Sequence, residues 1–583
     1  MRTINDPQQL RLIDVFQGVI GDGGWKLIRE GWQGAFRQVV LKELPVLRLG
    51  DDLDEFLGRP SAELHAMCGL LLIRDFHNWT VPESHLAVLF RSDVQYALNL
   101  EPGFEISQRT IERYLARLQE DEGLAAELMS LVTDRLVQVL DLQVGKQRLD
   151  STHVLSDMAS FGRTRMMGVA IKRFLVQVRR RQAADFEALP EEFRTRYSRT
   201  DGRLFGEAKT TEARQHSRQQ AAENLHWIIE HFANHPVIQE WPVYRQLVTI
   251  FGQQCEVVEE QIVVRKQTGG DIILNPSDPD ATYCGHKGQG YQVQLSETCD
   301  PDNEQQLILA ALPQTAVEHD SQAVEPMLDD LQSRGHLPDT LTCDCSYGSD
   351  ENVLEAAARG VTLISPVPGS AKFDAEALGP QHFEMNAATH EVTACPAGHA
   401  PIDSSYNAES DRVAVTMPLA TCQSCALKSR CPVLEKKDSA KLYFKMVEYR
   451  SGQRRQHEQT VEFKTNYAPR AGIESTNSGL KRRLGLGQLR VRGSPAVAPA
   501  LLLKITGWNI LRASGTAKLR ALVCKMMARE GHGALFSAIS WLTKAAHAIS
   551  RVLLKLLRHA KTPKPCKFTV ARSASKTPSL VAA

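Results

Sequence analysis

Apolar and polar positions repeat with a helical period over the first part of the chain. In SAELHAMCGLLLIRDF, residues 61–76, the apolar residues recur at helical spacing. ISQRTIERYLARLQED, residues 106–121, begins with a candidate Ser N-cap and continues as an amphipathic run. We therefore predict an all-helical region over residues 1–140. The second segment is compatible with a helix of a helix-turn-helix or, as the alternative, with a helix packed inside this region.

The period changes near residue 144. VGKQRLDSTHVLS, residues 144–156, is short, partly alternating and typical of a strand, and the pattern is helical again from about 160 to 265. Strand-like and helical segments then alternate along the chain, at residues 290–298, 305–316, 320–335, 339–349, 350–360 and 361–369. This order predicts an α/β fold, a mixed sheet with crossover helices.

The remaining third of the chain has a different pattern. Residues 370–447 look irregular and contain a cluster of cysteines, and the helical period returns from about residue 449. Residues 563–583 are basic and contain Ser and Pro, which predicts a disordered tail.

Composition adds one asymmetry to this picture. With 583 residues, of which 43% are hydrophobic and 23% charged, the chain has ordinary globular composition. The net charge of +1 hides a basic end, because residues 511–583 contain 14 Lys/Arg and one acidic residue, Glu530. Such a segment is attracted to a polyanion. The start has no apolar signal-peptide core, and no run of about 18 apolar residues occurs. We therefore expect a cytoplasmic protein without a membrane span.

Two predicted strands each carry an aspartate near their end. Asp150 lies in RLDSTHV, and Asp344 lies in TCDCSYGS. Cys343 and Cys345 flank Asp344 and are predicted to be small buried residues on the opposite face. A lone aspartate at such a position often forms an Asx-turn, so neither is diagnostic by itself. Asp157 is a less favoured alternative to Asp150.

A glutamate from a predicted helix supplies a third carboxylate. In YAPRAGIESTNSGLKRR, Tyr467, Arg470, Glu474 and Lys481 are separated by 3, 4 and 7 positions. On one α-helix, at ~100° per residue, their directions fall within roughly 60° of each other. A solvated helix face can have the same composition. Pro469 is tolerated near a helix start, so Tyr467 is expected just outside the regular helix.

The three carboxylates indicate a metal site. Clustered carboxylates raise one another's pKa unless a cation lies among them, and hard ions such as Mg²⁺ or Mn²⁺ bind oxygen ligands. Two such ions about 3.5–4 Å apart can activate a water or hydroxyl and stabilise the leaving oxygen of a phosphodiester. We expect Asp150, Asp344 and Glu474 to be the ligands of two ions per active site.

Basic side chains next to Glu474 fit a phosphate-binding role. Arg470 and Lys481 are expected to hold phosphate oxygens, and Tyr467 to donate a hydrogen bond to a phosphate or to stack on a base. Arg482 and Arg483 add further cations at the end of the same segment. Contacts of this kind give affinity for nucleic acid rather than sequence reading.

These segments resemble the bacterial insertion-sequence transposases with a DDE catalytic triad. YAPRAGIESTNSGLKRR fits the Y-x2-R-x3-E-x6-K signature of that family, and LDSTHVLSDM and CDCSYGSDENV resemble its two aspartate segments. The resemblance covers about residues 10–510. It implies a ribonuclease-H-like core and an N-terminal helical domain that binds transposon ends. It also implies that Asp150, Asp344 and Glu474 are catalytic metal ligands.

The resemblance further implies a reaction and its partners. An activated water cuts at the end of the element, and the freed 3′-hydroxyl attacks target DNA. Tyr467, Arg470 and Lys481 contact phosphates at the cleaved end. The DNA partners are the terminal inverted repeats and the target, and holding both ends together predicts a homodimer. The alternatives are a ribonuclease-H-like nuclease without strand transfer, and a decayed, zinc-stabilised DNA-binding protein.

A second metal site is indicated by the cysteine cluster. Cys395, Cys422, Cys425 and Cys431 have the spacing C-x26-C-x2-C-x5-C, and a C-x2-C pair suits tetrahedral Zn²⁺. His399 could replace one cysteine, and buried free thiols are the alternative. A closed four-ligand site is structural rather than catalytic.

These inferences predict three domains. Residues 1–140 form an N-terminal helical DNA-binding domain. Residues 141–510 form a ribonuclease-H-like catalytic domain, interrupted by a helical insertion at about 160–265 and by a small cysteine-rich, zinc-binding insertion at about 372–447. Residues 511–583 form a basic helical region followed by the disordered tail.

Overall fold

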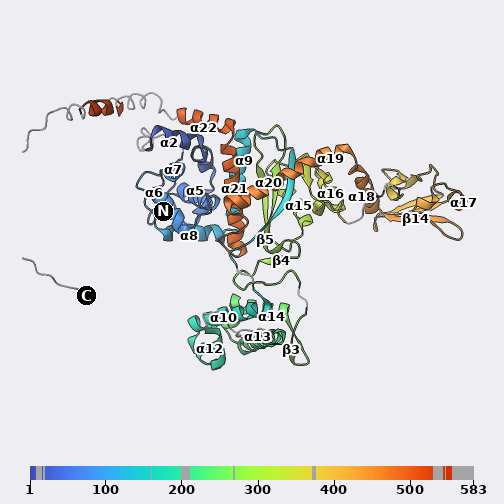
Figure 1. The fold of residues 1–583 in the computed structure, drawn as a ribbon, viewed down its shortest axis with the longest axis horizontal. Coiled ribbons are helices and arrows are strands. Elements are labelled where there is room, and N and C mark those ends of the chain that lie inside the picture. Colours follow the sequence, from blue (N-terminus) through green and yellow to red (C-terminus); the bar gives the residue numbers. More distant parts are fainter. Residues whose placement is uncertain are drawn as a thin grey trace, which may run out of the picture. The chain divides into compact units, whose positions relative to one another are not determined.

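A computed structural model describes most of the chain (Figure 1). The chain divides into two compact units, of which the first comprises Met1–Gln9 and Val15–Cys524 and the second Leu10–Asp14 and Lys525–Ala583. All elements discussed below, except the end of the last helix, belong to the first unit. The tail predicted at residues 563–583 lies outside the described residues. The structure describes residues 1–7, 16, 20–158, 161–198, 210–266, 269–369, 374, 376–529, 543–544 and 546–553.

The N-terminal region is helical, as its apolar period predicts. α5 is buried along its whole length, whereas α8 buries only the stripe of Ile111, Tyr114 and Leu118 and exposes its polar face. The α8 pattern therefore reflects packing on one side; a helix-turn-helix role stays a hypothesis. The helices are α2 (Asp22–Glu30), α3 (Trp32–Ala35), α4 (Val46–Leu49), α5 (Leu64–Phe76), α6 (Val81–Phe90), α7 (Ser92–Ala97), α8 (Gln108–Glu120) and α9 (Leu124–Leu140).

A six-stranded mixed sheet follows in the chain. β1, β7 and β8 are parallel, and β5 runs antiparallel to its neighbours β1, β4 and β6. The main strand order is therefore β6-β5-β1-β7-β8, with β4 pairing at the start of β5. The mixed α/β sheet predicted from the sequence is confirmed. The strands are β1 (Lys146–Val154), β4 (Thr282–Cys284), β5 (Gly288–Thr298), β6 (Ile308–Thr315), β7 (Thr340–Cys343) and β8 (Thr362–Ile364).

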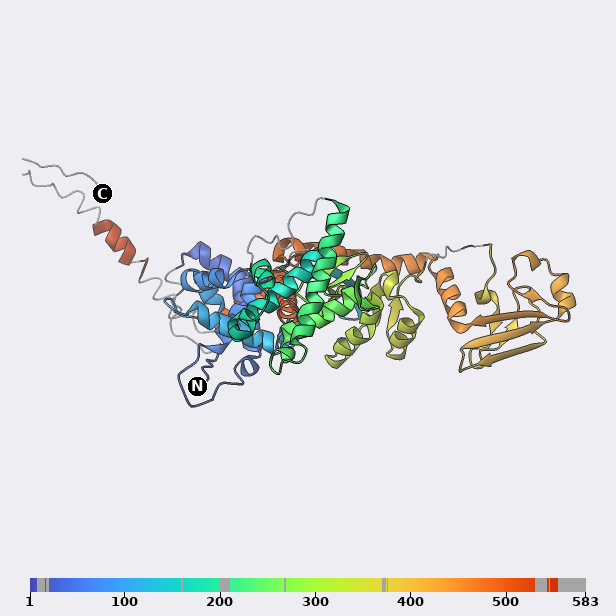
Figure 2. The same ribbon diagram turned by 90° about the horizontal axis from the view of Figure 1, so that it is seen from below.

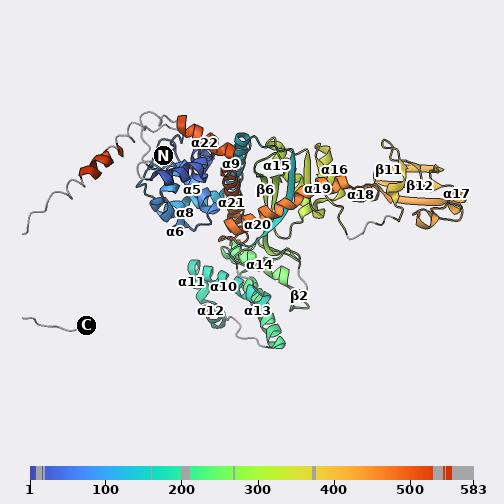
Figure 3. The same cartoon turned by 45° about the horizontal axis from the view of Figure 1, so that its top comes forward.

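Helices pack on both faces of this sheet. The crossover helices α15 (Val324–Ser333) and α16 (Asp350–Ala358) share a core with Leu149 of β1 and with β7. On the other side, α21 (Ser494–Ser514) contacts α5 and α9 as well as β6, so it lies between the N-terminal helices and the sheet (Figures 1 and 3). α21 is apolar around most of its circumference because it is buried on all sides.

A buried lysine joins α21 to two other helices. Lys504 is 2% exposed, and its Nζ donates to the carbonyl oxygens of Asp75 and Leu484 and to Asn78 Oδ1, at 2.8–3.0 Å. These acceptors belong to the end of α5, the end of α20 (Gly472–Leu484) and the loop after α5. A buried ammonium is tolerated only with such partners. Among the described residues, no helix is long and apolar enough to cross a membrane.

The segment between β1 and β4 forms a separate helical core, as predicted, but its end was predicted wrongly. Residues 255–264 form an antiparallel hairpin, β2 (Cys255–Val258) and β3 (Gln261–Val264), instead of helix. Val-rich strands flank Glu259 and Glu260, which both adopt positive φ at the turn. The helices are α10 (Arg163–Arg181), α11 (Ala183–Glu187), α12 (Glu191–Ser198), α13 (Thr211–Phe232) and α14 (Pro242–Gln254).

The cysteine-rich segment is not irregular, in contrast to the prediction. It contains a four-stranded antiparallel sheet, order β11-β12-β14-β13, over a small core of its own (Figure 2). RVAVTM, in β12, alternates buried and less buried positions, a signal that the sequence interpretation missed. The elements are β9 (Glu384–Met385), β10 (Val392–Ala394), β11 (Asp403–Asn407), β12 (Arg412–Met417), α17 (Leu419–Gln423), β13 (Leu434–Glu435) and β14 (Ala440–Lys445).

The chain then returns to helix, as predicted from residue 449. α18 (Met446–His457) and α19 (Val461–Tyr467) lead into a 3₁₀ turn, η8 (Ala468–Ala471), which is followed by α20. α22 (Ala517–Arg529) follows α21. The prediction of three separate domains is not tested by the fold and stays a prediction.

The contact between α5 and α21 depends on a glycine. A Cβ at Gly507 would lie 2.0 Å from the Cβ atom of Phe76. The Phe76 Cβ atom is bonded directly to the backbone, so rotation of the side chain cannot move it aside. We predict that Gly507→Ala lowers the free energy of unfolding by about 1–3 kcal/mol because it overpacks this contact. Gly252→Ala in α14 is the matched control: nothing lies within 4 Å of its new Cβ, so it is expected to stabilise by about 0.5–1 kcal/mol. Urea denaturation of both variants decides, and equal effects would contradict the packing argument.

Candidate active site

The two predicted aspartates lie on neighbouring parallel strands. β1 and β7 pair in a register that places Leu149 opposite Cys343. Asp150 and Asp344 are the next residues along the two chain segments, so they lie side by side at the same level of the sheet. Asp344 is the first residue after β7, and its Oδ1 accepts from the backbone N–H of Ser346 at 2.7 Å. It therefore forms an Asx-turn and also stands beside Asp150. Because the strand ends there, Cys345 is exposed, and the prediction that it is buried was wrong.

Glu474 comes from the first turn of α20, which packs over β1 (Figure 3). The four residues of the Y-R-E-K motif do not share one continuous α-helix. Tyr467 ends α19, Arg470 lies in the 3₁₀ turn η8, and Glu474 and Lys481 lie in α20. Since a 3₁₀ turn has about 3.0 residues per turn, the α-helical angle calculation does not apply to Arg470, nor to Tyr467.

The guanidinium of Arg470 nevertheless brings the three carboxylates together. Arg470 Nη1 lies 3.1 Å from Glu474 Oε1, and Nη2 lies 3.5 Å from Asp150 Oδ1 and 4.0 Å from Asp344 Oδ2. The Asp150 side chain is 13% exposed and that of Glu474 is 68% exposed, so the cluster opens to solvent at Glu474. Asp150, Asp344 and Glu474 thus surround one cationic group.

Burial and like charge shift the titration of Asp150. Burial raises its pKa to about 6, the neighbouring carboxylates of Asp344 and Asp320 add to this, and the Arg470 guanidinium opposes it. Burial by itself would lower the pKa of Arg470, but the surrounding negative charges raise it. Partial desolvation lowers the pKa of the Lys481 ammonium, and the charge of Asp150 opposes this shift. The site therefore holds a negative charge that one guanidinium only partly balances.

The donor chemistry of this site fits a hard divalent cation. Asn477 lies one turn after Glu474, its Nδ2 donates to Asp150 Oδ2 at 3.3 Å, and its Oδ1 is buried without a hydrogen-bond partner. Carboxylate and amide oxygens suit Mg²⁺ or Mn²⁺. In the described part of the chain, however, no group of three or more His, Cys, Asp or Glu side chains is arranged as a metal site. Sequence reasoning missed Asn477, although its i+3 spacing from Glu474 was a signal.

The predicted DNA-binding residues precede and follow Glu474 along the chain. Tyr467 is half-buried and stacks on Phe463, with ring centroids 5.5 Å apart and planes at 13°. Burial raises the pKa of its phenol, so the hydroxyl remains a donor. Lys481, Arg482 and Arg483 are exposed on the last turn of α20. A phosphate chain could therefore meet cations along this helix.

Asp157, the less favoured alternative to Asp150, lies outside the carboxylate cluster. It follows the end of β1, and its Oδ2 accepts from Arg492 at 2.9 Å; both side chains are about half exposed. An exposed pair of this kind contributes little stability. The geometry thus favours Asp150.

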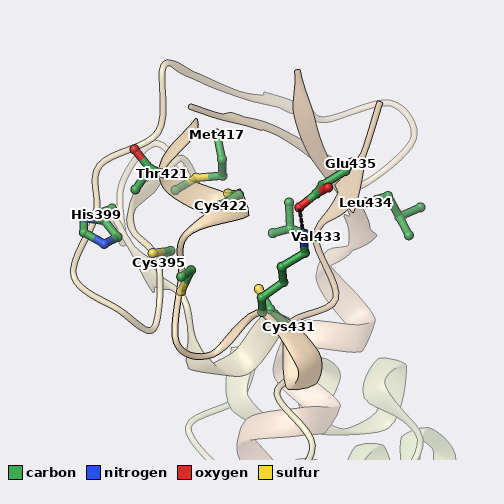
Figure 4. A pocket seen from close by; sticks show the side chains of 11 residues that line it. Cys395, His399, Met417, Thr421, Cys422, Cys431, Val433, Leu434 and Glu435 are labelled. Atoms are coloured by element: carbon green, nitrogen blue, oxygen red, sulfur yellow. Dashed lines mark ion pairs between the residues drawn. The ribbon is translucent and has the colours of Figure 1, made fainter. Parts of the chain in front are cut away.

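The four cysteines of the spacing pattern line one cavity of about 270 Å³ together with His399 (Figure 4). Cys395 follows β10, Cys422 lies in α17, and Cys431 follows a short 3₁₀ turn. The backbone N–H of Leu427 donates to Cys425 Sγ at 3.4 Å. Burial and the three neighbouring thiols raise the pKa of Cys422. The thiols face a common space, but they are not arranged as a metal site within the described residues.

The pKa of Asp150 generates a pH prediction. Its folded-state value, about 6, lies above its ordinary value of 3.8, so the stability it contributes is fully present below pH 3.8 and is lost as the pH rises through about 6. In chelator-treated protein, Asp150→Asn should therefore raise the free energy of unfolding at pH 7 by about 1–3 kcal/mol, and this gain should disappear near pH 4. The exposed Asp329→Asn in α15 is the control. Urea denaturation at both pH values decides; a gain that is the same at pH 4 and pH 7 would contradict the burial argument.

Comparison with known proteins shows that part of the chain is similar to one protein family. Residues 394–513 match the family model described as "Transposase DDE domain". The match includes Glu474 and the four clustered cysteines; Asp150 and Asp344 lie before it. No curated protein and no solved structure matched the chain. The matched segment ends in α21 and contains the helix that carries the third carboxylate. Over residues 394–513, the chain is similar to the DDE domain of transposases.

Proposed function

We propose that this protein cuts the ends of an insertion sequence and joins them to target DNA by phosphoryl transfer that depends on two divalent cations. The observation that carries the proposal is the position of Arg470, whose guanidinium contacts the carboxylates of Asp150, Asp344 and Glu474. Three acids from distant parts of the chain stand around one cation. An exposed helix face without function has no reason to meet two strand-end aspartates.

The sheet topology supports a ribonuclease-H-like core. The central strand β1 carries Asp150, its parallel neighbour β7 is followed by Asp344, and an antiparallel meander, β5 and β6, completes the other side. Helix α20 then places Glu474 over the central strand. The order of these elements agrees with the fold that the family resemblance implies.

In this proposal each side chain has a defined role. Asp150, Asp344 and Glu474 would hold Mg²⁺ or Mn²⁺, and Asn477 Oδ1 is a further oxygen donor beside them. When bound, the ions would supply an activated water or 3′-hydroxyl and stabilise the leaving oxygen. Arg470 offers a planar fork to a phosphate oxygen, Lys481 a point charge, and Tyr467 a hydroxyl donor. Arg482 and Arg483 extend the phosphate contacts.

The remaining parts of the chain would organise the DNA. The N-terminal helical region, residues 1–140, would bind the terminal inverted repeats, and the exposed polar face of α8 is available for this. Because two ends must be held together, the active form would be a homodimer on DNA. Target DNA would reach the carboxylates from the side where Glu474 is exposed.

The cysteine cavity would hold one structural Zn²⁺. Four thiols around one space are the ligand set of a closed tetrahedral site. Burial and the neighbouring thiolates both raise the pKa of Cys422, and a bound cation would favour the thiolate form against both. The small core over the four-stranded sheet of the cysteine-rich segment would depend on this ion.

One prediction of this function concerns catalysis. Asp344→Asn keeps size and shape but removes the charge, so it should abolish cleavage of a DNA duplex containing the element's end while binding stays nearly unchanged. Asp329→Asn, exposed on α15, is the matched control and should cleave normally. Gel assays with Mg²⁺ measure cleavage, and fluorescence anisotropy measures binding. Cleavage by Asp344→Asn at the control's rate would overturn the site assignment.

The same assay with pre-cleaved ends and a target plasmid separates the proposal from a nuclease that only cuts. Joined products are expected for wild-type protein, because the carboxylates that cut also serve the 3′-hydroxyl. Cleavage without any joined product would reject the transposase function and favour the nuclease.

A separate prediction concerns the cysteines. Elemental analysis of purified protein should give about one zinc per chain, and Cys425→Ser should lower this content and destabilise the segment 376–445. Cys284→Ser in β4, outside the cavity, is the control and should keep the zinc. A zinc-free wild-type protein that remains folded would reject the zinc site.

A further inference from the structure

A buried ion pair lies directly beneath the carboxylate site. Glu297 of β5 is fully buried, and Arg148 of β1 stands opposite it in the sheet. Arg148 Nε and Nη2 both donate to Glu297 Oε2, at 2.8 and 2.6 Å. Asp150 is two residues further along β1, so its side chain leaves the same face of the strand. The pair and the catalytic aspartate therefore belong to one row of side chains.

The second oxygen of Glu297 reaches the helix that carries Glu474. Thr476 Oγ1 donates to Glu297 Oε1 at 2.7 Å, and Thr476 is buried on α20, two residues after Glu474. Arg512 of α21 lies 3.7 Å from the same carboxylate oxygen and donates to Thr476 Oγ1 at 3.4 Å. One carboxylate thus joins strand β1 to helices α20 and α21.

Arg148 also fixes the turn that carries Arg470. Its Nη1 donates to the carbonyl oxygen of Pro469 at 2.9 Å, one residue before Arg470. Gly472 leaves room for this approach, because a Cβ there would lie 1.9 Å from the same nitrogen and would displace the guanidinium. The start of α20 is therefore held on both sides of Glu474, at Pro469 and at Thr476.

Burying a network of charged groups of this kind costs free energy of desolvation. Two guanidinium groups share one buried carboxylate, and replacement of buried ion pairs by apolar groups is often neutral or stabilising. What the network provides is geometry: two N–H groups of the planar Arg148 guanidinium donate to one oxygen of Glu297, and Thr476 donates to the other. The elements that it joins are those that carry Asp150, Arg470 and Glu474.

We propose that Arg148, Glu297, Thr476 and Arg512 are positioning residues that set the separation between Glu474 and Asp150 and thereby the affinity of the carboxylates for divalent cations. This inference rests on the proposed function, since it assigns the network to the same metal site. None of the four touches the reacting atoms. They act through the placement of α20 on β1.

The most selective test uses Thr476 in the full-length protein. Thr476→Val keeps the shape but removes the hydroxyl, whereas Thr476→Ser keeps the hydroxyl and is the matched control. Mn²⁺ titration followed by the electron paramagnetic resonance signal of the free ion gives the affinity. We expect Thr476→Val to bind Mn²⁺ about 10- to 100-fold more weakly than wild type, the range for loss of an outer-shell partner, and Thr476→Ser to bind nearly as wild type.

A second readout does not involve the metal. Amide hydrogen exchange of residues 472–484 in chelator-treated protein should be faster in Thr476→Val than in Thr476→Ser, while exchange in α10 stays the same. If Thr476→Val does not fold, Arg512→Lys is tested by the same two measurements. This variant keeps the positive charge but loses the planar guanidinium.

The outcomes separate the two proposals. Equal Mn²⁺ affinity and equal exchange for Thr476→Val, Thr476→Ser and wild type would overturn the positioning network. Failure of wild type to bind Mn²⁺, or undiminished binding by Asp344→Asn, would instead overturn the proposed metal-dependent function. Weaker Mn²⁺ binding by Thr476→Val with full rescue in Thr476→Ser would support both.

Discussion

The candidate site depends on three carboxylates that the fold brings around one guanidinium, that of Arg470. Asp150 and Asp344 leave neighbouring parallel strands at the same level, and α20 brings Glu474 over them. Such a cluster is unfavourable without a cation. Burial raises the pKa of Asp150, and the neighbouring carboxylate of Asp344 adds to this shift. In the structure Arg470 provides the compensating charge from a 3₁₀ turn one helical turn before Glu474. Three carboxylates around one guanidinium leave a net negative charge, which attracts divalent cations.

The surrounding architecture supplies rigidity to that cluster. The parallel pairing of β1 and β7 fixes the two aspartates, while the buried contacts of Glu297 hold the helix of Glu474 against β1. Lys504 adds a further restraint because it joins the end of α20 to α5 of the N-terminal helices. Helices that would bind DNA ends are thus connected to the helix that carries the third acid through buried hydrogen bonds. The helix that carries Glu474 is held at its start and at its end.

Much of this could be predicted from the sequence, and the exceptions have physical causes. The strand-end aspartates and Glu474 were identified because acids at such positions and the Y-R-E-K spacing are local patterns. The β hairpin after α14 and the sheet in the cysteine-rich segment were missed, because short alternating runs such as RVAVTM give a weaker signal than the spacing of the cysteines. The interruption of the helix at Pro469 could not be placed to the residue. The Glu297 network joins residues more than 100 positions apart, and only the register of β1 and β5 reveals it.

The central claim is that the three carboxylates bind a pair of divalent cations, and crystals soaked in Mn²⁺ test it most directly. Anomalous scattering should reveal two Mn²⁺ ions about 3.5–4 Å apart, with oxygens of Asp150, Asp344 and Glu474 as ligands and with Arg470 displaced from between them. Anomalous density elsewhere, or Arg470 still in contact with all three carboxylates at saturating Mn²⁺, would contradict the account.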